Sequence, residues 1–380
     1  MKQTARIIST YSADTFGVCS ALFELGGMTV MHDASGCNST YTTHDEPRWY
    51  DMDSMVYISG LSEMEAIMGD DEKLVGDIVE TAEQLQPEFI AIGGTPIPAM
   101  TGFDYQAAAE LIEARTGIPA FGFPTTGMNT YVAGASMALE GIAGRFVKKN
   151  AKRTVHLSAN LLGVTPLDFS VNGSVRAMED FLKRAGFEVI SRWAMGSSLE
   201  KLKDAGQASV NLVVSASGLG VAKALQEMFG TPYVVGTPIG AAYQEQLKRT
   251  LFWAAEKGSF ETDVSNLSEN EIAVIGEGVT SLSLAQAIEL TFQRGVKVLC
   301  ATECGKGLLR EKDFMTPDEE EITGALEGAR IIVADPLYRP ICPREAKFIP
   351  LPSENFSGRI YRNEIPNLIT GFEKYFGEVL

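Results

Sequence analysis

The chain has 380 residues, of which 45% are hydrophobic and 21% charged, a balance typical of a well-buried globular protein with two or three domains. Its formal net charge of −17 argues against a partner with a phosphate backbone, so we expect no nucleic-acid binding. No apolar run is long enough to span a membrane, and the first residues lack the apolar core of a signal peptide, so we expect no membrane attachment and a cytoplasmic location.

Apolar runs alternate with helical patterns in the first third of the chain. Strands are predicted at 28–33, 88–94 and 118–123, with helices at 104–117 and from Tyr131 to about Lys149. Continuous apolar strands separated by helices are typical of a mostly parallel sheet that is buried on both faces. The basic stretch 148–153 marks the end of this unit.

The same alternation occurs twice more. The second unit has predicted strands at 154–163, 187–193, 208–217 and 231–240 and a helix at 175–186. The third follows the polar stretch 261–270, with strands at 271–278, 296–304, 330–336 and 346–352 and helices at 283–295 and 319–329. The sequence therefore predicts an α/β fold of three Rossmann-like, doubly wound parallel-sheet domains, at 1–150, 151–268 and 269–380.

Several common enzyme motifs do not occur in the sequence. There is no GxxxxGK[ST] phosphate loop, so we expect no ATP hydrolysis by this chain, and GEGVTS (276–281) only loosely imitates a dinucleotide-binding fingerprint. The three histidines form no HExxH motif, and neither GxSxG nor CxxC occurs. Five cysteines in a long chain do not indicate a disulfide framework. In a reducing compartment they are more often ligands or nucleophiles.

Cys19 and Cys37 are the first candidate ligands. Cys37 follows the strand at 28–33 in a turn of small residues, where ligands gather in parallel α/β sheets. Cys19 lies near the start of a predicted helix, with Asp14 and Thr15 as possible caps, and a helix N-terminus favours a thiolate. Thiolates are the usual ligands of iron–sulfur clusters. The alternative is that both cysteines are small buried hydrophobic residues.

Two histidines lie on either side of Cys37 in the sequence. His32 ends the predicted strand and is either functional or a histidine whose hydrogen bonds are satisfied in the core. His44 is the better candidate for a catalytic proton donor. The loop 43–51 around it is either a solvated turn with Trp49 in the core or a surface near the cysteines where an electron-donating protein docks.

Three further cysteines occur in the third unit. Cys304 follows a predicted strand and precedes GKG, so we expect its thiol to face a cavity, where it is a candidate catalytic residue. Cys342 lies between Pro340 and Pro343, which favour a rigid loop at the same edge of the sheet. These two could line a cavity between the domains, bind a second metal or carry out redox chemistry. Cys300 belongs to the strand and is expected to be packing.

The order of these segments resembles the nitrogenase component 1 superfamily. MTVMHDASGCNSTY (28–41) is similar to the family's apolar strand and cysteine turn, and ISGLSEMEAIMGDDEKL (58–74) to its next segment. PEFIAIGGTPIPAMTGFD (87–104), LSANLLGVTPLDF (157–169) and LPSENFSGRIY (351–361) resemble later family segments. The resemblance extends over nearly the whole chain.

The resemblance implies a bridging iron–sulfur site. Cys37 matches the family's second cluster cysteine and Cys19 its first, whereas the third would fall near Pro96, which cannot ligate iron. One chain thus offers two ligands, and a homodimer, or pairing with a related subunit, would supply four for a shared [4Fe-4S] cluster. The cysteine that holds the family's large cofactor falls at about Val214 or Ser215, and no histidine follows His156, so an iron–molybdenum centre is not expected.

By this resemblance the chain is an oxidoreductase component. It would receive low-potential electrons from a separate ATP-dependent iron–sulfur reductase and reduce an unidentified small-molecule substrate. The alternative is a non-catalytic scaffold or maturation protein for a metallocofactor. A binding protein built from similar α/β lobes is disfavoured by the cysteines.

Overall fold

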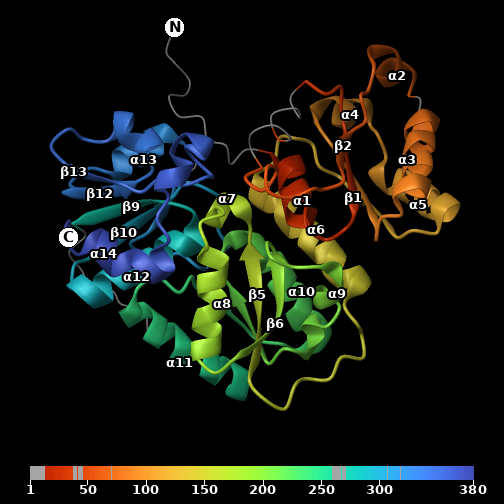
Figure 1. Cartoon of the computed structure of the whole chain (residues 1–380). Helices are drawn as coiled ribbons and strands as arrows, with labels where there is room; N and C mark the ends of the chain where they lie inside the picture. The colour runs from red at the N-terminus through yellow and green to blue at the C-terminus, as the bar shows by residue number, and fades with distance from the viewer. Residues whose placement is uncertain are drawn as a thin grey trace, which may run out of the picture.

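A computed structural model describes residues 13–36, 41, 46–69, 71–258, 267, 271–305, 307–316 and 318–380. The described strands form three separate sheets, and every strand pair in them is parallel (Figure 1). Helices flank each sheet, which confirms the predicted fold class of three Rossmann-like α/β layers. Each sheet lies within one of the three predicted segments, while the domain boundaries themselves stay predictions.

The first sheet has the strand order β2-β1-β3-β4. Its elements are α1 (Asp14–Leu22), β1 (Met28–His32), β2 (Val56–Ile58), α2 (Glu63–Met68), α3 (Asp71–Leu85), β3 (Ile90–Gly94), α4 (Pro96–Thr101), α5 (Tyr105–Thr116), β4 (Ala120–Phe123) and α6 (Tyr131–Phe146). The central strands β1 and β3 are buried at every residue, which is why their sequences are continuous apolar runs. Asp104 caps α5, and Gly117 ends it in the left-handed conformation.

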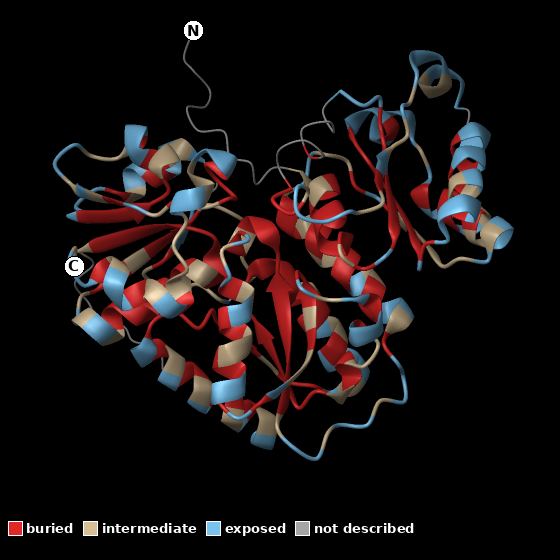
Figure 2. Cartoon of the chain, in the orientation of Figure 1, coloured by how far each residue is buried: buried red, intermediate tan, exposed pale blue. Residues whose placement is uncertain are grey.

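The second sheet has the order β6-β5-β7-β8. Its elements are β5 (Ser158–Val164), α7 (Pro166–Phe169), α8 (Ser174–Arg184), β6 (Glu188–Ala194), α9 (Leu199–Leu202), η2 (Ala205–Gln207), β7 (Val210–Val213), η3 (Ala216–Gly218), α10 (Leu219–Phe229), β8 (Tyr233–Val235) and α11 (Ala241–Lys257). The central strands β5 and β7 are fully buried. The middle of this sheet is therefore buried in the interior of the molecule (Figure 2).

The third sheet has the order β11-β10-β9-β12-β13. Its elements are β9 (Ile272–Gly276), α12 (Gly278–Phe292), β10 (Val296–Cys300), β11 (Phe314–Met315), α13 (Glu319–Ala325), β12 (Ile331–Ala334), η4 (Pro336–Ile341), β13 (Lys347–Pro350), η5 (Gly358–Glu364) and α14 (Leu368–Phe376). One apolar core runs from the second sheet into the third, so these two layers pack as a continuous unit.

Helix α6 connects the first sheet to the second. Its apolar side chains belong to a core that includes α1 on one side and residues of β5, β7 and α10 on the other. The crossing of α1 and α6 is close because glycines, Gly17 and Gly134, lie at the contact. In the part of the chain that is described, no helix has the length and apolar character needed to cross a membrane.

Candidate functional site

Cys19 lies in the interior of the protein beside the first sheet. It is the sixth residue of α1, its side chain is 1% exposed, and it packs in one apolar cluster with Met31 and Tyr41. The helix begins at Asp14, so the prediction that Cys19 lies near a helix start is wrong. Burial, followed by the negative charge of Glu46, raises the pKa of the Cys19 thiol well above its ordinary value. Without a metal, this side chain is a neutral thiol.

Asp14 holds the start of α1 against the loop that follows β4. Its carboxylate accepts hydrogen bonds from the backbone N–H groups of Thr126 and Gly127, at 3.0 and 2.7 Å, and from Asn129 Nδ2 at 3.0 Å. Asp14 is itself the first helical residue rather than a cap. Its contacts fix the position of the helix that carries Cys19.

Glu46 and Arg48 form a buried ion pair against α1. Arg48 Nε lies 2.7 Å from Glu46 Oε1, and the two side chains are 3% and 0% exposed. Ser20 Oγ and the Tyr41 hydroxyl donate to Glu46 Oε2, and Arg48 donates to the Ser20 carbonyl and to Glu24. Burial alone would raise the pKa of Glu46, but the charge and hydrogen bonds of Arg48 outweigh it and hold this pKa below its ordinary value. The pair is therefore ionised and fixes the chain at 46–48 onto α1.

Cys37 and His44, the predicted second ligand and proton donor, lie outside the described residues. Tyr41 lies between them in the sequence and is described: it belongs to the same apolar cluster as Cys19 and stacks on Phe16 with ring centroids 5.2 Å apart. Met31, which precedes Cys37 in the sequence, belongs to that cluster too. Described residues on both sides of Cys37 in the sequence thus pack around Cys19.

His32 ends β1 and has satisfied interactions in the core. Its Nδ1 lies 2.9 Å from Ser59 Oγ, and its ring packs on Phe103 with centroids 4.5 Å apart. Burial lowers the pKa of His32 to about 4, against the opposing effect of the Asp33 charge. The imidazole is therefore neutral near pH 7, and the structural interpretation of this residue is favoured over a catalytic one.

A cavity of about 460 Å³ lies where α6, α10 and the loop after β10 meet. We call it the Cys304 cavity; its lining includes Ser136 and Glu140 of α6, Lys223 and Glu227 of α10, and Cys304. Cys304 is half-buried and faces this space, as the sequence predicts. A catalytic role for its thiol stays a prediction.

The structure pairs Cys304 with Cys300 rather than with Cys342. Cys300 is the fully buried last residue of β10; its thiol donates to the carbonyl of Thr302 at 3.2 Å, and its sulfur and that of Cys304 both lie beside Gly278. Cys342 follows η4, and its thiol donates to the carbonyl of Tyr338 at 3.2 Å. It is not among the described residues that line the Cys304 cavity.

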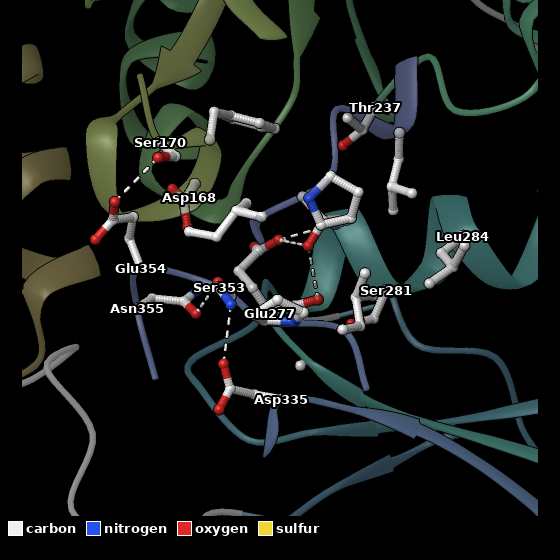
Figure 3. Close-up of a pocket in the computed structure, with 18 of the residues that line it drawn as sticks. Asp168, Ser170, Thr237, Glu277, Ser281, Leu284, Asp335, Ser353, Glu354 and Asn355 are labelled. Atoms are coloured by element: carbon white, nitrogen blue, oxygen red, sulfur yellow. Dashed lines mark hydrogen bonds between the residues drawn. The ribbon is translucent and has the colours of Figure 1, made fainter. Parts of the chain in front are cut away.

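A second cavity, of about 100 Å³, lies between the second and third sheets (Figure 3). We call it the Glu277 cavity; Asp168, Glu277, Asp335 and Glu354 contribute carboxyl groups to its lining. Ser353 N donates to Asp335 at 2.9 Å, and burial raises the pKa of Glu277 and of Asp335. Protonation of these two carboxyl groups is therefore easier than in water.

Glu277 is a residue that sequence reasoning missed. It follows β9 directly and caps α12, accepting from the N–H and hydroxyl of Thr280 at 2.8 and 2.9 Å. Its other oxygen accepts from Ala216 N of η3 at 2.9 Å, so it joins the second and third sheets. The available signal was an acidic residue placed directly after an apolar strand, in GEGVTS.

Comparisons with known proteins agree with this architecture. A family model described as nitrogenase component 1 type oxidoreductase matches residues 15–284. The structure titled "Nitrogenase Cp1 at pH 6.5" superposes with a TM-score of 0.70, at 16% identity, over 100% of this chain and 94% of that one. At this low identity the structural likeness shows the fold.

Two curated relatives have matching segments. The nitrogenase iron-molybdenum cofactor biosynthesis protein NifE of Clostridium pasteurianum is 26% identical over 180 residues, which is 47% of this chain and 38% of the relative. A light-independent protochlorophyllide reductase subunit of Nostoc punctiforme is 28% identical over 208 residues, 52% of this chain and 41% of the relative. The match thus spans less than half of the length of either relative.

Proposed function

The chain belongs to the nitrogenase component 1 type oxidoreductase family, and within it we propose that the protein is an electron-accepting catalytic component. It receives low-potential electrons from a separate ATP-dependent iron–sulfur reductase through a [4Fe-4S] cluster and reduces a small-molecule substrate. The observation that carries this proposal is the position of Cys19, buried among residues on both sides of Cys37 in the sequence. We place the protein in the cytoplasm, where such a cluster is protected.

The surroundings of Cys19 disfavour a free thiolate. A thiol whose pKa is raised by burial is not a free thiolate, and iron coordination supplies the positive charge that a thiolate needs there. When bound, the cluster would accept and release single electrons. The residues of the chain hold the ligand in place: Asp14 anchors the start of α1, and the ion pair of Glu46 with Arg48 fixes residues 46–48 against that helix.

Two thiols in one chain do not complete a four-iron site. Pro96, at the third family position, is the first residue of α4 and offers no ligand. We therefore infer a homodimer, or pairing with a related subunit, in which Cys19 and Cys37 of two chains bind one cluster.

An exposed apolar surface supports this pairing. Helix α2 has no buried residue, and three of its large apolar side chains, Met64, Ile67 and Met68, are 68 to 72% exposed. It contacts α4, where Met100 is 86% exposed and Ile97 is also exposed. We call these five side chains the methionine patch. Clustered exposed apolar side chains are typical of protein–protein interfaces.

The carboxyl groups of the Glu277 cavity suit a reduction, which consumes protons as well as electrons. Burial raises the pKa of Glu277 and Asp335, so either group can carry a proton at a higher pH than an exposed carboxyl group. We therefore place proton delivery to the substrate at this cavity. His44 is retained from the sequence as an alternative donor.

A scaffold or maturation role is the second candidate. It is favoured by the likeness to the NifE protein, whose printed name describes cofactor biosynthesis. The two candidates differ in catalysis: the enzyme turns over with a reductase and ATP, whereas the scaffold releases its metallocofactor to another protein.

The test is anaerobic purification followed by native mass, iron and sulfide measurements. We expect a dimer with about four iron and four sulfide per two chains, and tight ATP binding only when the reductase is present. Cys19→Ala and Cys37→Ala should each lose the iron, while Cys342→Ala, the matched control, keeps it. Iron that is absent from the wild type, or unchanged in Cys37→Ala, would contradict the proposal.

Pairing has its own test. Met100→Lys should convert the dimer to a monomer and remove the shared cluster, because a charge would be buried in an apolar interface. The control is Met228→Lys, on α10, a partly exposed methionine outside the methionine patch. A Met100→Lys protein that stays dimeric would exclude this surface as the interface.

A further inference from the structure

The third sheet places two thiols against one glycine. Cys300 ends β10, and Cys304 comes four residues later. Gly278 begins α12, the helix that follows β9, and β9 is the strand that pairs with β10. A Cβ atom on Gly278 would lie 2.6 Å from Cys304 Sγ, closer than real contacts allow, and 3.2 Å from Cys300 Sγ, tighter than most real contacts. Both sulfur atoms therefore occupy the space that the missing side chain leaves.

The two thiols differ in the direction in which their pKa values are shifted. The neighbouring Cys304 side chain lowers the pKa of Cys300, against the opposing effect of burial, whereas the neighbouring Cys300 side chain, together with burial, raises the pKa of Cys304. The negative charge of Glu277 also opposes ionisation of either thiol. Cys300 is thus the sulfur that ionises first, and Cys304 holds the proton.

The thiol that ionises second, Cys304, is the more accessible of the two from the cavity. Cys304 faces the Cys304 cavity, whereas Cys300 is fully buried behind it. A small disulfide that enters the cavity meets Cys304 first. Cys300 is then placed to resolve the product, because its sulfur and that of Cys304 lie beside the same glycine, Gly278.

We propose that Cys300 and Cys304 are a redox-active dithiol that closes to a reversible disulfide on reaction with a small disulfide in the Cys304 cavity. Cys300 takes the proton of Cys304, and the Cys304 sulfur, now a thiolate, attacks one sulfur of the incoming disulfide, which forms a mixed disulfide and releases one small thiolate. Cys300 then gives that proton to the released thiolate, and the Cys300 sulfur attacks the Cys304 sulfur and releases the second small thiolate, which takes a proton from water. Two protein thiols are oxidised and one small disulfide is reduced to two thiols, so the electrons balance.

A metal centre at the same place is less well supported. Among the residues that the structure describes, no group of three or more His, Cys, Asp or Glu side chains could hold a metal ion. A pair of sulfurs alone provides only half of a tetrahedral thiolate site. Disulfide chemistry needs the two sulfurs and access to one of them, and both are present.

The sequence offers a direct readout for the test. Trypsin cleavage after Lys297 and Lys306 gives the peptide VLCATECGK, which contains both thiols and no other cysteine. The full-length protein is treated with glutathione disulfide, quenched with an alkylating reagent and digested. We expect this peptide to become unalkylated and lighter by two hydrogen atoms, at least about tenfold faster than in the urea-unfolded chain, since the native fold brings the sulfurs together.

Variants separate the steps. Cys300→Ser should stop at a stable glutathione adduct on Cys304, and Gly278→Ala should slow closure because its Cβ occupies the space of the sulfurs. Cys342→Ala, the control, should close as the wild type does. Closure no faster than in the unfolded chain, or a Cys304 adduct that persists in the wild type, would overturn the proposal.

This inference does not depend on the iron–sulfur cluster. Iron content is measured on Cys300→Ser in parallel, and we expect it to equal that of the wild type. Loss of iron in every sample would count against the proposed function alone, whereas failure of disulfide closure in an iron-loaded protein would count against the dithiol alone.

Discussion

Replacing Gly134 with alanine should destabilise the protein by separating α1 from α6. A Cβ atom at this position would lie 1.8 Å from the carbonyl oxygen of Asp14, on α1. At the same crossing, a Cβ on Gly17 would lie 2.1 Å from the Tyr131 carbonyl oxygen. Ordinary carbon–oxygen contacts are about 3.3 Å or longer, so the helices would have to move apart by roughly 1.5 Å.

The expected magnitude follows from two opposing effects. Alanine is the better helix former by about 1 kcal/mol. Overpacking typically costs about 1–3 kcal/mol, and the upper end applies at Gly134 because the atom that is met is backbone and cannot rotate away. We expect Gly134→Ala to lower the free energy of unfolding by about 2 kcal/mol. Gly144, exposed on the same helix with nothing within 4 Å of its Cβ position, should gain up to about 1 kcal/mol as alanine.

The measurement is urea unfolding of wild type, Gly134→Ala and Gly144→Ala, followed by circular dichroism, with hydrogen exchange of peptides from α1 and α6 to locate the change. Exchange in Gly134→Ala should accelerate in both helices. The reasoning is refuted if Gly134→Ala is as stable as Gly144→Ala, because the close crossing of the helices would then not constrain that residue.

Two other predictions concern buried charge near the first sheet. Folded His32 has a pKa of about 4 and an unfolded histidine about 6.5, so the unfolded chain binds the proton first as the pH falls. The free energy of unfolding should therefore fall by about 2 kcal/mol between pH 6.5 and 4. In His32→Gln the urea midpoint should depend less on pH across that range, and a pH dependence equal to that of the wild type would contradict this. Arg48→Met should destabilise by about 3–5 kcal/mol, because Glu46 is left as an uncompensated buried charge, and the double variant with Glu46→Gln should recover much of that loss in thermal unfolding. Equal stabilities of the single and double variants would refute the importance of the pair.

The strands could be predicted because their burial is reflected in the local sequence. β3 and β9 are buried at every residue, and a continuous apolar run records that burial. The predicted ends of the elements were less accurate. β5 begins at Ser158 rather than 154, since Val155 is fully exposed and outside the sheet. Helix α12 begins at Gly278, earlier than predicted, because the Glu277 side chain caps residues that are poor helix formers.

The candidate sites could be predicted only in part. Residue type and position after a strand identified Cys304 as facing a cavity, which the structure supports. The pairing of its sulfur with Cys300 depends on Gly278, more than twenty residues away in the sequence, and no local pattern contains that contact. The start of α1 at Asp14 was missed for a similar reason: the contacts of Asp14 come from the loop at Thr126, across the domain.

Helix α6 contributes to both candidate sites. Gly134 on this helix sets the approach of α1, which carries Cys19, while Ser136 and Glu140 on the same helix line the Cys304 cavity. Ser136 Oγ donates to Glu140 at 3.0 Å, and both side chains pack on α10 at Gly220, where a Cβ would meet them within 2.2 Å. The helix is therefore packed closely at a glycine on both sides. At Gly134 the facing atoms are backbone atoms of Asp14 and cannot rotate away, so a shift of α6 at this point must also move the helix that carries Cys19.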